Sequence, residues 1–268
     1  MDYCILFKIK DFIMDIKDFV IDSHAHCGIL DHTFDQSFEA YFSYVEKTQI
    51  KQVVMFPPVM EIYNRYDFQF KDTDQWQKKR KQANEYLLGI GNKDLLVIPY
   101  LFIWNDFQVR QLTPKHKGIK WHRHSNEPLY NYDSTECRNA IAEIKKRNMP
   151  VVLEEELKNT ILFIEKLAPG VRVIIPHLGG LNGGYTAIKN YGLWDNPDVY
   201  TDTALASSFE ISDYIETYGH ERIMFGSDFP FGDPESELNK IYRLNINNNI
   251  RKAVLCDNIT SLLADSNV

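Results

Sequence analysis

The sequence predicts an α/β protein with one eight-stranded (β/α)8 barrel, and three observations support this. Eight short apolar runs alternate with stretches long enough for a crossover helix, as parallel strands require. Several runs end in a histidine, a carboxylate or a lysine, and such groups collect where barrel strands end. The length of 268 residues lies in the usual range for one barrel. Residues 1–268 are therefore expected to form a single domain.

The expected strands are β-prone runs bounded by turn residues, at 19–23, 51–56, 95–101, 118–122, 151–154, 171–176, 199–202 and 222–226. Apolar residues at helical spacing predict helices at 37–49, 72–90, 134–148, 157–168 and 247–265. These helices would coat the barrel. Residues 1–13 precede this pattern and are expected to be an N-terminal appendage, either an added strand or an extension outside the core.

Composition limits the classes of partner and of binding site that this protein can have. A formal net charge of -7 leaves no broad basic surface, which argues against nucleic acid as a partner and favours a small-molecule substrate. Cys4, Cys27, Cys137 and Cys256 lie far apart without a CxxC spacing, so no disulfide or cysteine zinc site is expected, and a cytoplasmic location is the default. Charges interrupt the N-terminal apolar run too often for a signal peptide or a membrane span.

Two long loops, 56–73 and 122–134, follow the second and fourth strands and should overhang the barrel mouth. Their aromatic residues either line a substrate pocket or only pack the loops down, and both readings stay open. These residues are Tyr63, Tyr66, Phe68, Tyr130 and Tyr132. Exposed aromatic loops also make a homodimer a reasonable expectation. His32, His116 and His220 have no special placement and are expected at the surface.

Four candidate metal ligands end three of the expected strands. His24 and His26 in DSHAH are two residues apart, so both face one side of a strand, with Asp22 behind them as support. His177 and Asp228 each end a strand of their own. Because the strand ends meet at one mouth, these side chains are expected to share a divalent ion. The alternative for His177 is a core histidine with satisfied hydrogen bonds.

These motifs, HAH, PHLGG and GSDFP in this order, resemble those of the metal-dependent amidohydrolase superfamily, in its amidohydrolase 2 branch, over residues 19 to 265. The resemblance implies a TIM-type barrel with one or two divalent ions, most often zinc, that activates water for hydrolysis. Some similar proteins instead catalyse decarboxylation or hydration. It also implies that His24 and His26 ligate metal, that Asp228 ligates metal or accepts a proton, and that His177 polarises water or substrate or binds a second ion.

The fifth strand departs from the family pattern, because PVVLEEE places Glu154 where a histidine is usual. As a metal ligand, which is the favoured reading, Glu154 completes a set of imidazoles and carboxylates that suits zinc and also manganese. Alternatively, it pairs with Lys120 of the adjacent strand. The resemblance further implies that Lys120 is either carboxylated to bridge two metals or, as GIKWH favours, a catalytic cation near the substrate.

The expected function is that of a metal-dependent hydrolase acting on a small, carboxylated amide, ester or lactone. Asp228, His177 and Lys120 are its expected catalytic residues, while His122 and Arg123 would bind the substrate. For His122 and Arg123 the alternative is a solvated polar loop. A decarboxylase or hydratase of a small carboxylic acid is the alternative activity. A non-catalytic binding protein that has lost a ligand at position 154 is the third reading.

Overall fold

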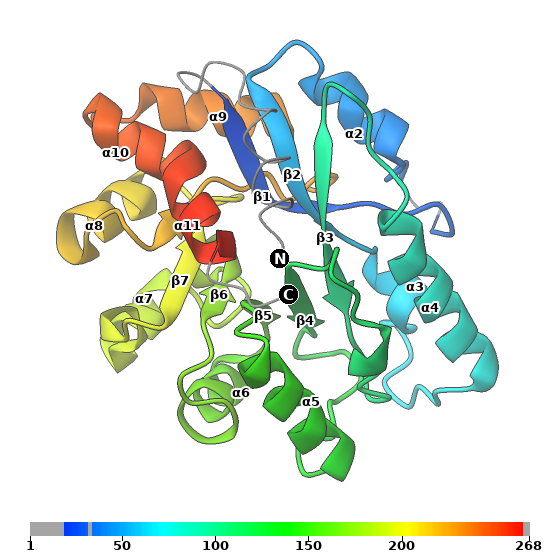
Figure 1. Ribbon diagram of the computed structural model, residues 1–268. Coiled ribbons are helices and arrows are strands. Elements are labelled where there is room, and N and C mark those ends of the chain that lie inside the picture. The colour runs from blue at the N-terminus through cyan, green and yellow to red at the C-terminus, as the bar shows by residue number, and fades with distance from the viewer. Residues whose placement is uncertain (1–18, 32–33, 265–268) are drawn as a thin grey trace, which may run out of the picture.

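Eight parallel strands pair in chain order around one sheet (Figure 1). The computed structural model describes residues 19–31 and 34–264, so the expected appendage at 1–13 and His32 lie outside the described residues. The strands are β1 (Val20–His26), β2 (Ile50–Phe56), β3 (Leu96–Phe102), β4 (Gly118–His122), β5 (Val151–Glu154), β6 (Val173–Ile175), β7 (Val199–Asp202) and β8 (Ile223–Met224). Each expected strand is present, and the predicted (β/α)8 barrel of TIM type is confirmed.

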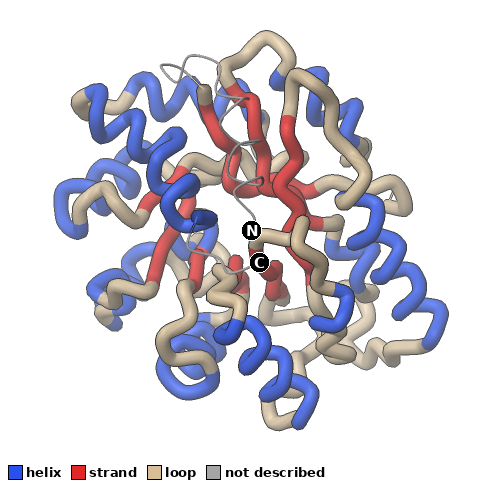
Figure 2. The backbone as a smooth tube through the Cα atoms, in the orientation of Figure 1, coloured by secondary structure: helices blue, strands red, loops and turns tan. Residues whose placement is uncertain are grey.

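Helices lie between the strands and cover the outside of the barrel (Figure 2). They are α2 (Phe38–Val45), α3 (Val59–Ile62), α4 (Asp74–Leu87), α5 (Thr135–Lys146), α6 (Leu157–Leu162), α7 (Tyr185–Tyr191), α8 (Ser208–Tyr218), α9 (Pro234–Arg243), α10 (Asn248–Lys252) and α11 (Asn258–Ala264). Two π-helical stretches, Phe163–Leu167 and Ala253–Asp257, extend α6 and join α10 to α11. None of the helices in the described part of the chain combines the length and the hydrophobicity that a membrane span requires.

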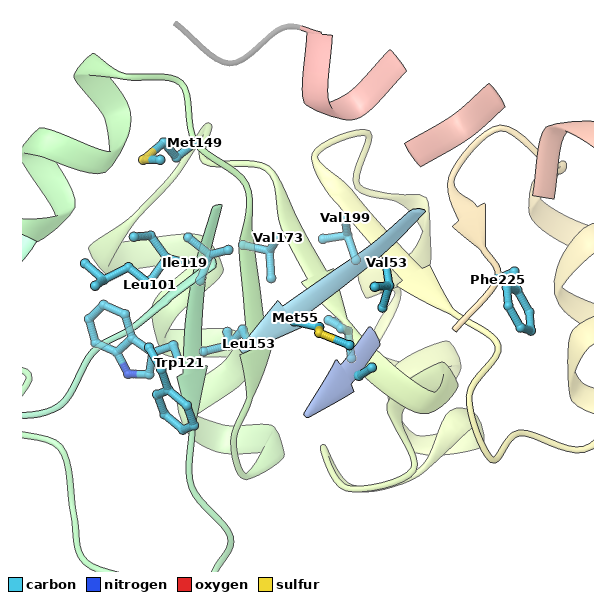
Figure 3. Close-up of a cluster of buried hydrophobic side chains, with 14 of the residues drawn as sticks. Val53, Met55, Leu101, Ile119, Trp121, Met149, Leu153, Val173, Val199 and Phe225 are labelled. Atoms are coloured by element: carbon cyan, nitrogen blue, oxygen red, sulfur yellow. The ribbon is translucent and has the colours of Figure 1, made fainter. Parts of the chain in front are cut away.

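The strands bury both faces, and alternate residues belong to two separate apolar clusters. The larger cluster packs the outward faces of the strands against the helices, and Figure 3 shows part of it. The smaller cluster contains inward residues such as Ile21, Val152 and Ile174, together with Ile259 and Leu262 of α11. Helix α11 therefore packs against the amino-terminal half of the barrel interior. The carboxyl-terminal half of the interior contains mostly polar side chains, which pack around the ring of Phe56.

The barrel closes between β8 and β1 at a seam that has few hydrogen bonds. The two strands have no ladder, and one parallel bridge, Ala25 to Phe229, stands in its place among the described residues. Backbone bonds from Ser23 N to Phe225 O, from His26 N to Phe229 O and from Asp228 N to His24 O complete the closure, at 2.8, 2.8 and 2.7 Å. The seam thus passes directly beside the HAH motif.

Candidate functional site

The HAH motif at the end of β1 places two imidazoles in the barrel mouth. His24 and His26 are two residues apart on the strand, and both side chains are buried. Asp228 follows β8 and lies across the seam from them. Its Oδ1 is 3.3 Å from His24 Nε2 and 3.4 Å from His26 Nε2. The first and last strands therefore bring three of the predicted ligands together.

His177 reaches the same carboxylate from the turn after β6. Its Nε2 is 3.4 Å from Asp228 Oδ2, and its ring centroid is 4.8 Å from that of His24. One ligand atom from each of His24, His177 and Asp228 lies within 4.8 Å of the other two. Three of the four side chains that the sequence suggested as sharing an ion thus lie around one point, and the fourth, His26, contacts this group through Asp228.

The imidazoles of this group have unused nitrogen atoms. His24 Nε2 and both ring nitrogens of His177 are buried and make no hydrogen bond within the described residues. Buried polar atoms nearly always have a partner, because burying them alone costs roughly 1–3 kcal/mol each. Two imidazole nitrogens and a carboxylate oxygen are ligands that zinc and manganese accept. The residues present therefore fit a divalent ion at this point.

Strained backbone holds two of these residues in place. His177 and Asp228 have φ of 57° and 55°, a left-handed conformation that side chains other than glycine rarely adopt. Such residues cost roughly 1–3 kcal/mol each and cluster at functional sites. Gly226 precedes Asp228, and a Cβ at this position would lie 3.0 Å from the His24 Cβ. The glycine lets the chain after β8 pass close to β1 on its way to the site.

Asp202, at the end of β7, supports two of the histidines and was not singled out from the sequence. Its Oδ2 accepts a hydrogen bond from His24 Nδ1 at 2.8 Å, and its Oδ1 accepts one from the His177 backbone N–H at 2.9 Å. The first bond keeps the proton on Nδ1, so that Nε2 of His24 faces Asp228. The only sequence signal for Asp202 was its position at the end of an expected strand.

Neighbouring charges set the protonation of this group. Burial and Lys120 lower the pKa of His24, but Asp202 and Asp228 outweigh them and raise that pKa to about 9. Burial raises the pKa of Asp228, but His24, His177 and His26 together hold it well below its usual range. Asp228 is therefore ionised at neutral pH. His24 must release a proton when a cation binds, which couples cation affinity to pH.

Asp22 forms hydrogen bonds across the seam between β8 and β1, and not with the imidazole rings of the site. Its Oδ2 accepts hydrogen bonds from the hydroxyls of Ser227 and Tyr41, at 2.5 and 2.8 Å, and its Oδ1 accepts bonds from the backbone N–H groups of His24 and Ser227. The side chain is fully buried, and burial raises its pKa to about 6. Asp22 thus ties β1 to the segment that carries Asp228.

Lys120 and Glu154 pair with each other inside the barrel. Lys120 Nζ lies 3.0 Å from Glu154 Oε2, while Glu154 Oε1 lies 3.1 Å from His122 Nε2 and 2.6 Å from His124 Nε2. Within residues 19–31 and 34–264, no hydrogen bond or ion pair links Glu154 to His24, His177 or Asp228. The structure therefore shows the pairing that was the alternative for Glu154, and its ligation of a metal stays a prediction.

Arg123 is buried, and its guanidinium already has ion-pair and hydrogen-bond partners within the protein. Its guanidinium forms ion pairs with Glu155 and Glu156, at 2.6 and 2.8 Å, and donates to the backbone carbonyls of Ser125 and Glu127. These contacts hold the loop after β4 against the segment after β5. Substrate binding by Arg123 and His122 stays a prediction, and Arg123 would have to give up such bonds to take part.

A small pocket opens beside His26. It has a volume of about 60 Å³, and its lining includes His26, Pro58, Met60, Arg65, Tyr66 and Phe231. The aromatic loop residues therefore divide between the two roles expected for them. Tyr66 lines the pocket, whereas Tyr63 and Tyr130 are buried and stack on or beside Trp104. Phe68 is exposed.

A sequence model of the family described as amidohydrolase matches residues 109–264. No curated protein sequence matches the chain. Solved structures do match it over most of its length, at identities that carry information on the fold alone.

Three of these structures illustrate the range of enzymes to which the chain is similar in fold. 2,6-Dihydroxybenzoate decarboxylase from Rhizobium is 12% identical, with 92% of this chain and 99% of that chain covered and a TM-score of 0.75. Dihydroxybenzoic acid decarboxylase from Polaromonas sp. JS666, with bound manganese and 2-nitroresorcinol, is 13% identical, with 92% and 97% covered and a TM-score of 0.70. A protein from Pseudomonas putida assigned as a 2-pyrone-4,6-dicarboxylic acid hydrolase is 16% identical, with 92% and 97% covered and a TM-score of 0.62.

Proposed function

The chain belongs to the amidohydrolase family, and from that premise we propose that it is a metal-dependent hydrolase of a small, carboxylated amide, ester or lactone. The observation that carries this proposal is the convergence of His24, His177 and Asp228 within 4.8 Å, with buried imidazole nitrogens that have no other partner among the described residues. His26, which faces Asp228 from the pocket side, completes the proposed ligand set.

A divalent ion held there would lower the pKa of coordinated water to about 7 and would polarise a substrate oxygen. Asp202 keeps His24 in the tautomer whose Nε2 faces the site. Asp228 is ionised and can accept a proton from the attacking water, because three imidazoles stabilise its negative charge. The ring nitrogens of His177 make no hydrogen bond among the described residues, and its Nε2 lies 3.4 Å from Asp228, so His177 can hold a substrate oxygen or pass to the leaving group the proton that Asp228 accepts.

The proposal includes zinc as the ion, with manganese as the alternative, because nitrogen and oxygen donors suit both. The Polaromonas relative contains bound manganese. We also propose one catalytic domain, a cytoplasmic location and a small-molecule substrate. Tyr66 and Phe231 are exposed at the mouth, which is compatible with a homodimer.

The experiment that tests the proposal removes the charge of Asp228. We expect Asp228→Asn to lower turnover by at least about 100-fold, which is the usual contribution of a positioned acid or base. The matched control is Asp94→Asn, because Asp94 is an exposed carboxylate on a loop. Metal content and turnover are measured on the same preparations. A variant with bound metal and wild-type turnover would remove Asp228 from catalysis, and wild-type protein that refuses zinc and manganese would favour the binding-protein reading.

Decarboxylation of a small carboxylic acid is the second candidate activity. Two of the structures that match along the whole barrel are dihydroxybenzoate decarboxylases. In addition, Lys120 places a buried ammonium 4.4 Å from the centre of the Phe56 ring, which itself contacts the rings of His24 and His26. Release of carbon dioxide from dihydroxybenzoates, with no hydrolysis of amides, esters or lactones, would select this activity.

A further inference from the structure

We propose that Glu61 is a positioning residue of the site, because its buried carboxylate fixes the loop after β1 as one wall of the pocket beside His26. This inference rests on the proposed function, since it concerns how the same site holds a substrate. Glu61 lies on the single turn of α3 and was not singled out from the sequence. The loop after β1 comprises 28–31 and 34–36 among the described residues, and the side chains that it adds to the pocket lining are those of Asp31, Phe34 and Gln36.

The Glu61 carboxylate is fully buried, and its hydrogen bonds within the described part of the chain all go to this loop. Its Oε1 accepts from the backbone N–H groups of Leu30 at 2.6 Å and Asp31 at 2.9 Å, whereas its Oε2 has no partner among the described residues. Burial of a carboxylate costs free energy unless it is well paired. An apolar side chain would therefore be more stable here if packing alone mattered, and the two bonds to the loop are what Glu61 adds.

The loop is shaped to receive this carboxylate. A Cβ at Gly28 would lie 2.4 Å from Glu61 Oε1 and 2.5 Å from Pro58 Cδ, so glycine lets the chain pass this close. The Gly28 backbone N–H donates to the Gln36 carbonyl oxygen at 2.9 Å, which closes the loop at its base. Successive backbone N–H groups that converge on one anion form a compact anion-binding turn. Here the anion is a side chain of the protein itself.

The helical turn that carries Glu61 is in turn fixed by α4. Lys79 Nζ donates to the Met60 carbonyl oxygen at 2.7 Å, and Arg80 Nη1 donates to the Ile62 carbonyl oxygen at 2.7 Å. The last carbonyl groups of a helix have no partner within the helix, so these two donors satisfy them. Met60 also lines the pocket. Helix α3 and the loop after β1 therefore form one continuous wall that is joined through Glu61.

This wall lies beside the proposed metal ligands without carrying them. His26 lines the pocket from β1, and the Phe231 ring meets it at a centroid distance of 5.7 Å. Phe34 of the loop contacts Phe231 from the other direction, at 6.3 Å. Displacement of the loop would change the shape of the pocket, whereas the strands that hold His24 and Asp228 would stay in place. Loss of the Glu61 carboxylate should therefore weaken the binding of groups that occupy the pocket and leave ion binding unchanged.

The first measurement is hydrogen exchange of the full-length protein, read by mass spectrometry. Glu61→Met keeps the length of the side chain and removes its acceptors. Peptides that contain Leu30 and Asp31 should then exchange roughly 10- to 100-fold faster than in the wild type, as loss of hydrogen bonds to a charged acceptor implies. Peptides from β4 should exchange as in the wild type, which distinguishes a local change from global destabilisation. Glu61→Gln retains an acceptor oxygen and should restore most of the protection.

The second measurement separates a positioning role from a purely structural one. Titration calorimetry of the zinc-loaded protein compares acetohydroxamate, which reaches little beyond the metal, with benzohydroxamate, whose ring needs the pocket. We expect the wild type to prefer benzohydroxamate, and Glu61→Met to weaken this probe roughly 10-fold, the effect of losing about 55 Å² of apolar contact. The affinities for acetohydroxamate and for zinc should not change. The control, Glu85→Met, removes an exposed carboxylate of α4 and should alter none of these quantities.

Lys79→Met keeps the test decisive if Glu61→Met fails to fold. Lys79 is only partly buried, and its loss removes the bond to the Met60 carbonyl while Glu61 stays intact. Both measurements should shift in the same direction by a smaller factor. Wild-type exchange at Leu30 and Asp31 in every variant that folds, or equal affinities of the wild type for the two hydroxamates, would overturn the inference.

The two measurements also separate this inference from the proposed function. Faster exchange at Leu30 and Asp31 in Glu61→Met, in a protein that takes up no zinc, would refute the proposed function and support the fixing of the wall by Glu61. Conversely, zinc binding and turnover with a preference for benzohydroxamate that Glu61→Met does not change would refute the role of Glu61 and leave the metal-dependent hydrolase intact.

Discussion

At the scale of single residues, one carboxylate organises two histidines that lie far apart in the sequence. Asp202 fixes the ring of His24 through Nδ1 and the backbone of His177 through its N–H. The left-handed φ of 57° at His177 is unfavourable for an isolated chain, so it needs such an external partner. Asp202 is therefore expected to contribute to ion binding without touching the ion.

Removal of the Asp202 carboxylate tests this role. Asp202→Ala should lower the affinity for zinc by roughly 10- to 100-fold, which is typical when a residue that orients a metal-ligating histidine is lost. Competition with a chromophoric chelator measures the affinity. Asp195→Ala, at an exposed position shortly before β7, serves as the control. If both variants bind zinc as tightly as the wild type does, packing alone orients His24.

The sequence allowed prediction of His24, His26, His177 and Asp228 but not of Asp202. The first four end apolar runs in motifs with characteristic glycines and prolines, so the sequence alone places each of them at the mouth. Asp202 also ends a strand, but its contacts depend on how the seventh strand aligns with β6 and on the turn after β6. That alignment is a tertiary property that no local pattern encodes.

At the scale of elements, the register of β4 and β5 brings Glu154 beside Lys120 and His122. His122 pairs with Glu154, and Lys120 with Val152, in the parallel ladder, so the inward-facing side chains of both strands are neighbours. Sequence analysis identified the strands and the partners, but the position of Glu154 relative to the metal group depends on barrel geometry. For the same reason, the sequence did not reveal the contacts of Arg65 with Glu127 and His124, because they require the loops after β2 and β4 to meet.

The connection between β3 and β4 is closed by a histidine that was expected at the surface. His116 is instead buried, its Nδ1 accepts a hydrogen bond from the Thr113 backbone N–H at 3.1 Å, and burial lowers its pKa from 6.5 to about 4. The surface expectation was wrong because His116 lies in an irregular turn without hydrophobic periodicity. The ring is thus neutral in the folded protein at neutral pH.

This burial predicts a pH dependence of stability. Between pH 6.5 and about 4 the unfolded chain binds a proton at His116 that the folded protein does not, so the free energy of unfolding falls as the pH is lowered. The loss from this residue is at most about 3 kcal/mol and is complete below pH 4. Urea unfolding of the wild type and His116→Gln over this range measures it. Parallel pH profiles for both proteins would contradict the prediction.

At the scale of the whole molecule, ion binding and barrel closure involve the same segments. The proposed ligands lie on β1, after β6 and after β8, and two of these segments flank the seam. An ion that binds the folded but not the unfolded chain adds to the free energy of unfolding by mass action. Closure should therefore be stronger in the presence of metal.

Removal of the ion should lower the unfolding temperature by several degrees. At an ion concentration 100-fold above the dissociation constant, the expected loss is about 3 kcal/mol. Calorimetric scans before and after chelation, and again after zinc is restored, measure the difference. The Asp228→Asn variant should respond less than the wild type does. Identical scans for the wild type with and without chelator would show that no stabilising ion is bound.

Seven of the eight junctions around the sheet are ordinary parallel ladders, and the eighth depends on one bridge, a few backbone bonds and the Asp22 carboxylate. A cation bound by His24 on β1 and by Asp228 after β8 would act there as a reversible cross-link between the first and the last strand of the barrel. Removal of the cation should therefore open the junction between β8 and β1 first. The seven remaining ladders would keep the other strands paired, so that the barrel can close again when the cation returns.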